Sequence, residues 1–154
     1  MRKLYVVRHA DAGHRGHGSR PDAERELSER GWRQAEGLCL ELGERDITRL
    51  VASPFVRCVQ TLEPLGKVLG VSVESDDRLA EGAGASGALA VAAEVCDTGA
   101  VLCSHGDVIP DLLEHLLAHG AKLKDELRWQ KASTWVLSWD GDELTKGRYI
   151  PPPA

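Results

Sequence analysis

The side chains that could do chemistry together in this sequence lie in three short polar clusters, each directly after an apolar run. The clusters are residues 8–9, 53–57 and 104–106, and the apolar runs are residues 4–7, 50–52 and 100–103. Between them the clusters hold two arginines and two histidines: Arg8, Arg57, His9 and His105. Arginine binds phosphate oxygens through paired, charge-assisted hydrogen bonds. If the clusters meet, their composition therefore predicts a phosphate site.

A histidine in such a site is a potential nucleophile. Neighbouring positive charges disfavour the imidazolium form, so His9 would be held neutral. Ser53 and Ser104 lack the GxSxG context of an activated serine, and all four cysteines lie in apolar runs. Gly106, at the start of a helix expected near Asp107, would add backbone N–H donors for phosphate oxygens. The residues therefore indicate phosphoryl transfer through a histidine.

Two histidine pairs could suggest a metal centre, namely His115 with His119 and His14 with His17. The first pair has helical i, i+4 spacing, but the glutamate of an HExxH motif is absent because residue 116 is leucine. No cysteine or carboxylate has matching ligand spacing. We therefore expect no metal and no cofactor.

Alternating strands and helices must position the three clusters. Strands are predicted at residues 4–7, 50–52, 71–73, 100–103, 134–139 and 143–149. Helices are predicted from Ser28 to about residue 42, from Ser53-Pro54 to residue 69, to about Cys96 after a loop at residues 80–90, and around residues 112–117. This order indicates one α/β domain over residues 1–150, a three-layer α/β/α arrangement with a mostly parallel sheet, and a proline-rich tail at residues 151–154. The clusters would lie at the carboxyl ends of strands, where open sheets bind ligands.

Charge and hydropathy exclude some partners. The formal charge of −5 and pI of about 5.7 argue against binding a nucleic-acid polymer, which needs a basic face. The apolar stretch at residues 4–7 is too short for export or a membrane span. Unpaired cysteines in apolar runs indicate buried, reduced thiols and a cytoplasmic protein. Nothing in the sequence indicates the oligomeric state.

Four segments in order resemble the signatures of the histidine phosphatase, or phosphoglycerate mutase-like, superfamily. They are Leu-Tyr-Val-Val-Arg-His at residues 4–9, Arg-Glu-Leu-Ser-Glu-Arg-Gly at 25–31, Ser-Pro-Phe-Val-Arg-Cys-Val-Gln-Thr at 53–61, and Ser-His-Gly at 104–106. The resemblance runs from residue 4 to about residue 140 and implies the phosphoglycerate mutase-like fold. Ala10 stands where the family usually has glycine.

The resemblance also implies roles for individual residues. His9 would be the nucleophile, with Arg8 and Arg57 binding the phosphoryl group and His105 hydrogen-bonding it. Glu81 occupies the place of the general acid in many members. Three further substrate-binding residues are expected: Arg25, for which Arg20 is an alternative, Ser104 and Gly106.

The resemblance also indicates which classes of substrate to expect. The short chain resembles the SixA-like branch, the protein phosphohistidine phosphatases, which implies a phosphorylated protein or a small phosphorylated metabolite as partner. Residues 60–65, 108–112 and 131–137 resemble the phosphatase domain fused behind Nudix hydrolase domains in actinobacterial proteins, which implies a nucleotide-directed phosphatase as the alternative. A phosphate-binding module without turnover is the alternative from another class.

Overall fold

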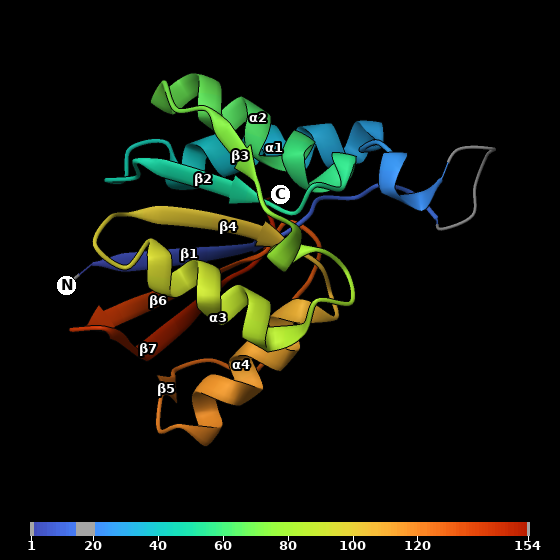
Figure 1. The fold of residues 1–154 in the computed structure, drawn as a ribbon. Coiled ribbons are helices and arrows are strands. Elements are labelled where there is room, and N and C mark those ends of the chain that lie inside the picture. Colours follow the sequence, from blue (N-terminus) through green and yellow to red (C-terminus); the bar gives the residue numbers. More distant parts are fainter. Residues whose placement is uncertain (1, 15–20, 154) are drawn as a thin grey trace.

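Alternating strands and helices make up the computed structural model, which describes residues 2–14 and 21–153 (Figure 1). The strands are β1 (Lys3–Arg8), β2 (Arg49–Ala52), β3 (Val73–Ser75), β4 (Ala100–Ser104), β5 (Lys122–Leu123), β6 (Thr134–Asp140) and β7 (Glu143–Ile150). The helices are α1 (Glu29–Leu42), α2 (Val56–Leu69), α3 (Gly84–Glu94) and α4 (Val108–Ala118), with short 3-10 helices η1 (Asp22–Glu24) and η2 (Asp77–Leu79).

The strands form one sheet in the order β3-β2-β4-β1-β6-β7-β5. Strand β1 lies at its centre, parallel to β4 and antiparallel to β6. The pairs β2-β3, β2-β4 and β5-β7 are also parallel, while β6 and β7 form an antiparallel hairpin. The predicted mostly parallel sheet is therefore confirmed, with an antiparallel part at β6.

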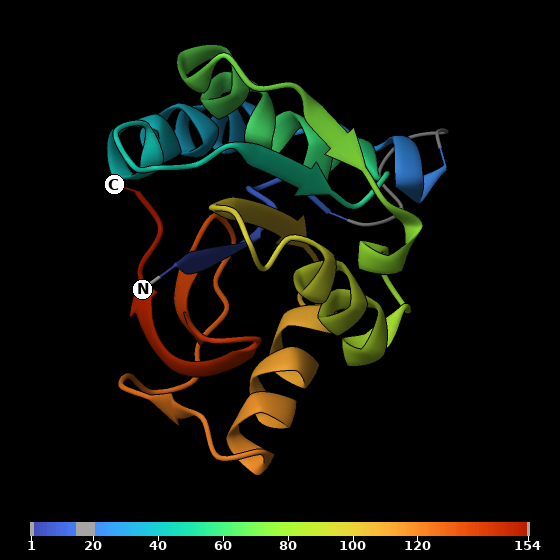
Figure 2. The ribbon, with the colours of Figure 1, turned by 60° about the vertical axis from the view of Figure 1, so that its left-hand side comes forward.

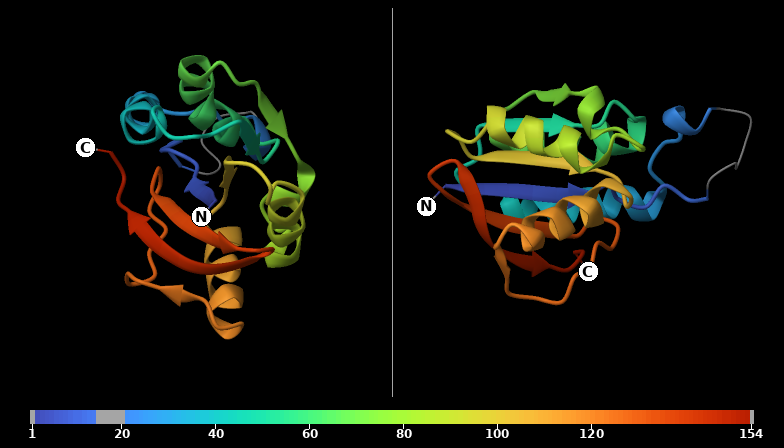
Figure 3. Two further views of the ribbon diagram at one scale, coloured as in Figure 1. Left: turned by 90° about the vertical axis from the view of Figure 1, so that its left-hand side faces the viewer. Right: turned by 60° about the horizontal axis from the view of Figure 1, so that its bottom comes forward.

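Helices cover both faces of this sheet (Figures 2 and 3). Leu38 of α1 and Leu62 of α2 pack with Tyr5 and Val7 of β1 in one core cluster. Val91 of α3 and residues of α4 pack with Leu4 and Val6 in the other. Successive side chains of a strand point to opposite faces, so the apolar run of β1 contributes to both cores. The predicted α/β/α layering is confirmed.

Helix α1 begins where its sequence predicts. Ser28 caps it by accepting a hydrogen bond from the Gly31 backbone N–H at 3.0 Å. Gly31 has a second role, because a Cβ added there would lie 1.9 Å from the carbonyl oxygen of Asp11. The helix therefore packs directly on the chain segment that leaves β1.

Several boundaries differ from the sequence prediction. Helix α2 begins at Val56 rather than at Ser53-Pro54, because the Ser53 hydroxyl is hydrogen-bonded to His105 and to the Phe55 N–H. Strand β3 lies two residues later than predicted, α3 begins inside the predicted loop at residues 80–90, and the two-residue strand β5 was not predicted.

Other side chains clarify the sequence predictions outside the site. Trp135 and Trp139 are core residues, as their alternation in the strand predicts. The rings of His115 and His119 stack with centroids 4.1 Å apart. Cys58 and Cys103 are buried, but Cys39 and Cys96 are half-buried, so burial was predicted wrongly for two of the four thiols. Within the described residues, no helix is long and apolar enough to cross a bilayer.

Candidate active site

The pairing of β1 with β4 brings together two of the three polar clusters. Arg8 is the register partner of Ser104, and the His9 N–H donates to the Ser104 carbonyl at 3.0 Å. The rings of His9 and His105 consequently lie edge to face, with centroids 5.5 Å apart. Two histidines separated by almost a hundred residues are neighbours because their strands are parallel and end together.

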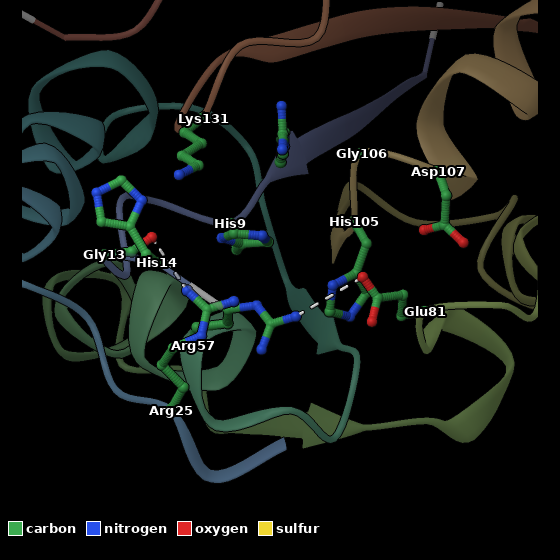
Figure 4. A pocket seen from close by; sticks show the side chains of 11 residues that line it. His9, Gly13, His14, Arg25, Arg57, Glu81, His105, Gly106, Asp107 and Lys131 are labelled. Atoms are coloured by element: carbon green, nitrogen blue, oxygen red, sulfur yellow. Dashed lines mark hydrogen bonds and ion pairs between the residues drawn. The ribbon is translucent and has the colours of Figure 1, made fainter. Parts of the chain in front are cut away.

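The third cluster completes a pocket of about 470 Å³ at this end of the sheet (Figure 4). Its lining is Arg8, His9, Gly13, His14, Arg25, Arg57, Glu81, His105, Gly106, Asp107 and Lys131. Seven of the eight predicted site residues are among these, and Ser104 is not. Four of the lining side chains are arginine or lysine and two are acidic, so the pocket is cationic in a chain whose net charge is negative.

The hydrogen bonds around His9 fix its ring and its tautomer. Its Nδ1 lies 2.8 Å from the Ala10 carbonyl oxygen, which can only accept, so Nδ1 carries the proton and Nε2 keeps a lone pair. The Ala10 N–H donates to Thr61 Oγ1 at 2.9 Å, and Thr61 in turn donates to the Arg57 carbonyl at 2.6 Å. The first two turns of α2 therefore hold the backbone on which the imidazole is oriented.

The surroundings of His9 also keep it neutral. Burial lowers its pKa to about 3, and the positive charges of Arg57, His105 and Arg8 act in the same direction, against the hydrogen bond to Ala10. The residue is only 5% exposed. A neutral imidazole with a free Nε2 is the form that can act as a nucleophile.

Arg57 is a fully buried cation, 1% exposed, at the start of α2. It donates to the Asp22 carbonyl at 2.9 Å and to the Asp22 carboxylate at 3.2 Å. Its guanidinium lies 4.9 Å from the Phe55 ring centroid and 4.0 Å from a carboxylate oxygen of Glu81. These contacts hold the charge beside His9 (Figure 4).

Arg8 and His105 are positioned in similar ways. Arg8 donates to the Trp129 carbonyl at 3.0 Å, and burial lowers its pKa. His105 Nε2 lies 2.8 Å from the Ser53 hydroxyl. Among the described residues, three buried nitrogens of this site make no hydrogen bond: Arg8 Nε, Arg57 Nε and His105 Nδ1. Buried nitrogens of this kind in a cationic pocket suit an oxyanion.

The remaining predicted residues differ in their positions. Arg25 lines the pocket, but its guanidinium donates to the Ala12 carbonyl at 2.7 Å and to Asp22 at 3.1 Å, so it also braces the loop after β1. Ser104 is turned away, because its hydroxyl donates to the Leu79 carbonyl at 2.7 Å. Arg20 and His17 lie outside the described residues.

Gly106 approaches Arg8 closely. A Cβ added at this glycine would lie 2.8 Å from the central carbon of the Arg8 guanidinium. The absence of a side chain at residue 106 therefore allows the arginine to lie across the turn into α4.

Four lining residues were not predicted: Gly13, His14, Asp107 and Lys131. The Asp107 carboxylate accepts the Gly82 N–H at 2.8 Å, which ties the segment after Glu81 to the turn before α4. Asp107 directly follows the Ser-His-Gly motif, so its position was a usable signal. Lys131 comes from the segment before β6 and lies 3.4 Å from Asp11; it begins the resembling segment 131–137, but that resemblance gave it no role in the site.

Comparison with known proteins agrees with this geometry. The model of the histidine phosphatase superfamily (branch 1) matches residues 4–89, which carry His9, Arg57 and Glu81. The chain belongs to the histidine phosphatase superfamily.

Individual proteins resemble the chain to different degrees. An 8-oxo-(d)GTP phosphatase of Mycolicibacterium smegmatis is 36% identical over 97% of this chain. The chain spans about half of that relative, 48% of its length. The structure of a SixA-type candidate phosphohistidine phosphatase from Nakamurella multipartitia has a TM-score of 0.76 at 27% identity and covers 99% of this chain and 97% of its own. The protein histidine phosphatase SixA complexed with tungstate has a TM-score of 0.75 at 20% identity, covering 99% and 96% of the two chains, and supports the fold.

Proposed function

We propose that this domain is a metal-independent phosphatase that works through a phosphohistidine intermediate on His9. The observation that carries the proposal is the state of His9, a buried neutral imidazole whose Nδ1 is bound to Ala10 and whose Nε2 is left for attack. Arg8 and Arg57 place two guanidinium groups in the same pocket. Phosphoryl transfer needs little beyond such positioning and charge stabilisation.

The reaction has two in-line steps. In the first, the lone pair of His9 Nε2 forms the P–N bond while the bond from phosphorus to the leaving group breaks. In the second, a water oxygen attacks phosphorus, the P–N bond breaks, and the water proton is lost. Arg8, Arg57 and His105 would stabilise the charge on the transferring oxygens.

Glu81 is our candidate for the proton transfers that these steps require. Its carboxyl lines the pocket and lies 4.0 Å from the Arg57 guanidinium. It would give a proton to the leaving group in the first step and take one from water in the second. Glu81→Gln should slow esters with poor leaving groups far more than p-nitrophenyl phosphate, whose leaving group needs little protonation.

For the substrate we propose protein phosphohistidine or a small phosphomonoester. The fold shared with SixA-type proteins supports this choice. A nucleotide-directed phosphatase is the second candidate, supported by the mycobacterial relative that acts as an 8-oxo-(d)GTP phosphatase. The relative rates on a phosphohistidine peptide and on a panel of nucleoside phosphates would decide between them.

The test of the mechanism compares wild type with His9→Ala on p-nitrophenyl phosphate and phosphoramidate, in excess chelator. Wild type should turn over both, and the variant neither. His119→Ala is the matched control, since it replaces an exposed histidine that does not line the pocket. An acid-labile, base-stable phosphoenzyme should be trapped in wild type only.

Each contrary result has a definite meaning. Activity in a folded His9→Ala protein would overturn the mechanism. If the wild type is active without chelator and inactive in excess chelator, metal independence is overturned. Phosphate binding by a wild type that hydrolyses neither compound nor any member of the peptide and nucleotide panels would favour a binding module without turnover.

A further inference from the structure

A second hollow of about 410 Å³ adjoins the catalytic pocket. It is lined by Arg8 and by four consecutive residues of the segment before β6: Leu127, Arg128, Trp129 and Gln130. Arg8 lines both spaces, and its guanidinium donates to the carbonyl of Trp129, a residue of the hollow, at 3.0 Å. The rest of a molecule whose phosphoryl group sits beside His9 would have to pass Arg8 to reach this hollow.

The topology explains why this segment reaches the site. Strand β6 runs antiparallel to β1, with Thr134 paired to Val7. The chain entering β6 must therefore pass the carboxyl end of β1, where His9 lies. The position of the hollow beside the pocket therefore follows from the antiparallel pairing of β6 with β1.

Side chains from several elements fix the segment in place. Three consecutive carbonyls accept a hydrogen bond from a side chain: that of Arg128 from Trp135 Nε1 at 2.7 Å, that of Trp129 from Arg8 at 3.0 Å, and that of Gln130 from Ser133 at 2.6 Å. The Gln130 side chain also accepts a hydrogen bond from the Tyr149 hydroxyl at 3.1 Å. The wall of the hollow is thus organised before any ligand arrives.

The backbone at the end of the segment has an unusual conformation and is hydrogen-bonded to the backbone of the nucleophile. Ala132 has a φ of 65°, the only positive value among the described non-glycine residues. Its N–H lies 3.0 Å from the Arg8 carbonyl and 3.2 Å from the His9 carbonyl. Left-handed backbone at a residue other than glycine persists where the surrounding structure over-determines it. The segment and the backbone of His9 are therefore held as one unit.

The chemistry of the wall favours a particular occupant. Trp129 is half-buried, and with Leu127 it offers apolar surface, while Arg128 and Gln130 offer N–H donors. Aromatic faces and guanidinium planes both stack on planar rings.

We propose that the hollow formed by Leu127–Gln130 binds the leaving group of the substrate and selects planar aromatic or heteroaromatic leaving groups. This proposal rests on the proposed phosphatase function, since it assigns the neighbouring pocket to the phosphoryl group. It makes Trp129 a specificity-determining residue. A purely structural explanation is that Trp129 only fills the edge of the core, against which it packs.

Binding of two non-hydrolysable phosphonates by calorimetry separates these explanations. Phenylphosphonate would fill both spaces, and methylphosphonate only the catalytic pocket. In Trp129→Leu, which keeps apolar volume but removes the ring, the preference for phenylphosphonate over methylphosphonate should fall by about tenfold. Trp129→Phe should retain most of the preference. The Kd of methylphosphonate should be unchanged in both variants, which also shows that the pocket remains folded.

The same variants are then assayed for turnover. In Trp129→Leu, KM for p-nitrophenyl phosphate should rise about tenfold, while hydrolysis of phosphoramidate changes less than about twofold. The leaving-group site would be overturned if Trp129→Leu weakened the binding of both phosphonates equally, or of neither. The phosphatase function would still stand in that case. If wild type binds both phosphonates with the expected preference but hydrolyses nothing, the proposed function fails and the hollow remains.

Discussion

His9→Asn should change how the stability of this protein depends on pH. The asparagine amide can still donate to the Ala10 carbonyl, but it does not titrate. In the wild type, burial and nearby positive charges lower the pKa of His9 from its ordinary value of 6.5 to about 3. Between these two values the unfolded chain binds more protons than the folded one. The free energy of unfolding therefore rises with pH in this range. The contribution of His9 to it is fully present above about pH 6.5 and is lost as the pH falls towards about 3.

The size of the effect follows from the two pKa values. At pH 5 almost every His9 is protonated in the unfolded chain and almost none in the folded protein. One pKa unit corresponds to about 1.36 kcal/mol, so lowering the pH from 7.5 to 5 should cost the wild type about 2 kcal/mol through this residue alone. The variant lacks this contribution, whereas all other titrating groups are shared by the two proteins.

The assay is urea unfolding of both proteins at pH 7.5, 6 and 5, followed by circular dichroism. The decisive quantity is the difference between the two proteins in the free energy lost from pH 7.5 to 5. A difference near 2 kcal/mol supports a neutral, buried His9. Equal losses in the two proteins would show that His9 titrates normally, which would refute both the pKa argument and the basis of the nucleophile assignment.

Three substitutions test other contacts of the site and its support. Arg57→Lys keeps a positive charge but loses the paired N–H donors, so kcat for p-nitrophenyl phosphate should fall by roughly 10²–10³ while circular dichroism stays unchanged. Gly106→Ala would place a methyl group 2.8 Å from the guanidinium carbon of Arg8; the displaced arginine should lower kcat/KM about 10²-fold, and an unchanged rate would contradict its role. Gly31→Ala would place a methyl group 1.9 Å from the Asp11 carbonyl oxygen, so urea unfolding should show a loss of about 1–3 kcal/mol.

The sequence predicted the elements of this fold better than their edges. Buried strands such as β1 and β4 are continuous apolar runs, and the cap at Ser28 marks α1 unambiguously. The start of α2 was wrong because Ser53 has two possible uses. Its hydroxyl accepts the Phe55 N–H close to the start of the helix, and it also bonds His105, which follows the neighbouring strand. Local sequence cannot distinguish a cap from a long-range partner.

The candidate site shows the same division. Residues at the ends of strands, such as His9 and His105, could be placed because parallel strands end together. Lys131 could not, since it reaches the pocket through the antiparallel entry into β6 and the left-handed backbone of Ala132. Ser104 was expected to bind substrate, but alternation along β4 turns its hydroxyl to Leu79. Whether Glu81 and Arg25 act as proposed stays a prediction for experiment.

The central place of β1 has a consequence for how the molecule is made. The first strand to be synthesised pairs with β4 and β6, whose residues follow about 100 and 130 positions later. Contacts so distant along the chain slow folding, because a long loop must close before they form. During synthesis the apolar β1 has no partner strand until β4 has left the ribosome, and its second edge stays open until β6 follows. The pocket around His9 thus forms only after nearly the whole domain exists, and until then the apolar residues of β1 are exposed to aggregation.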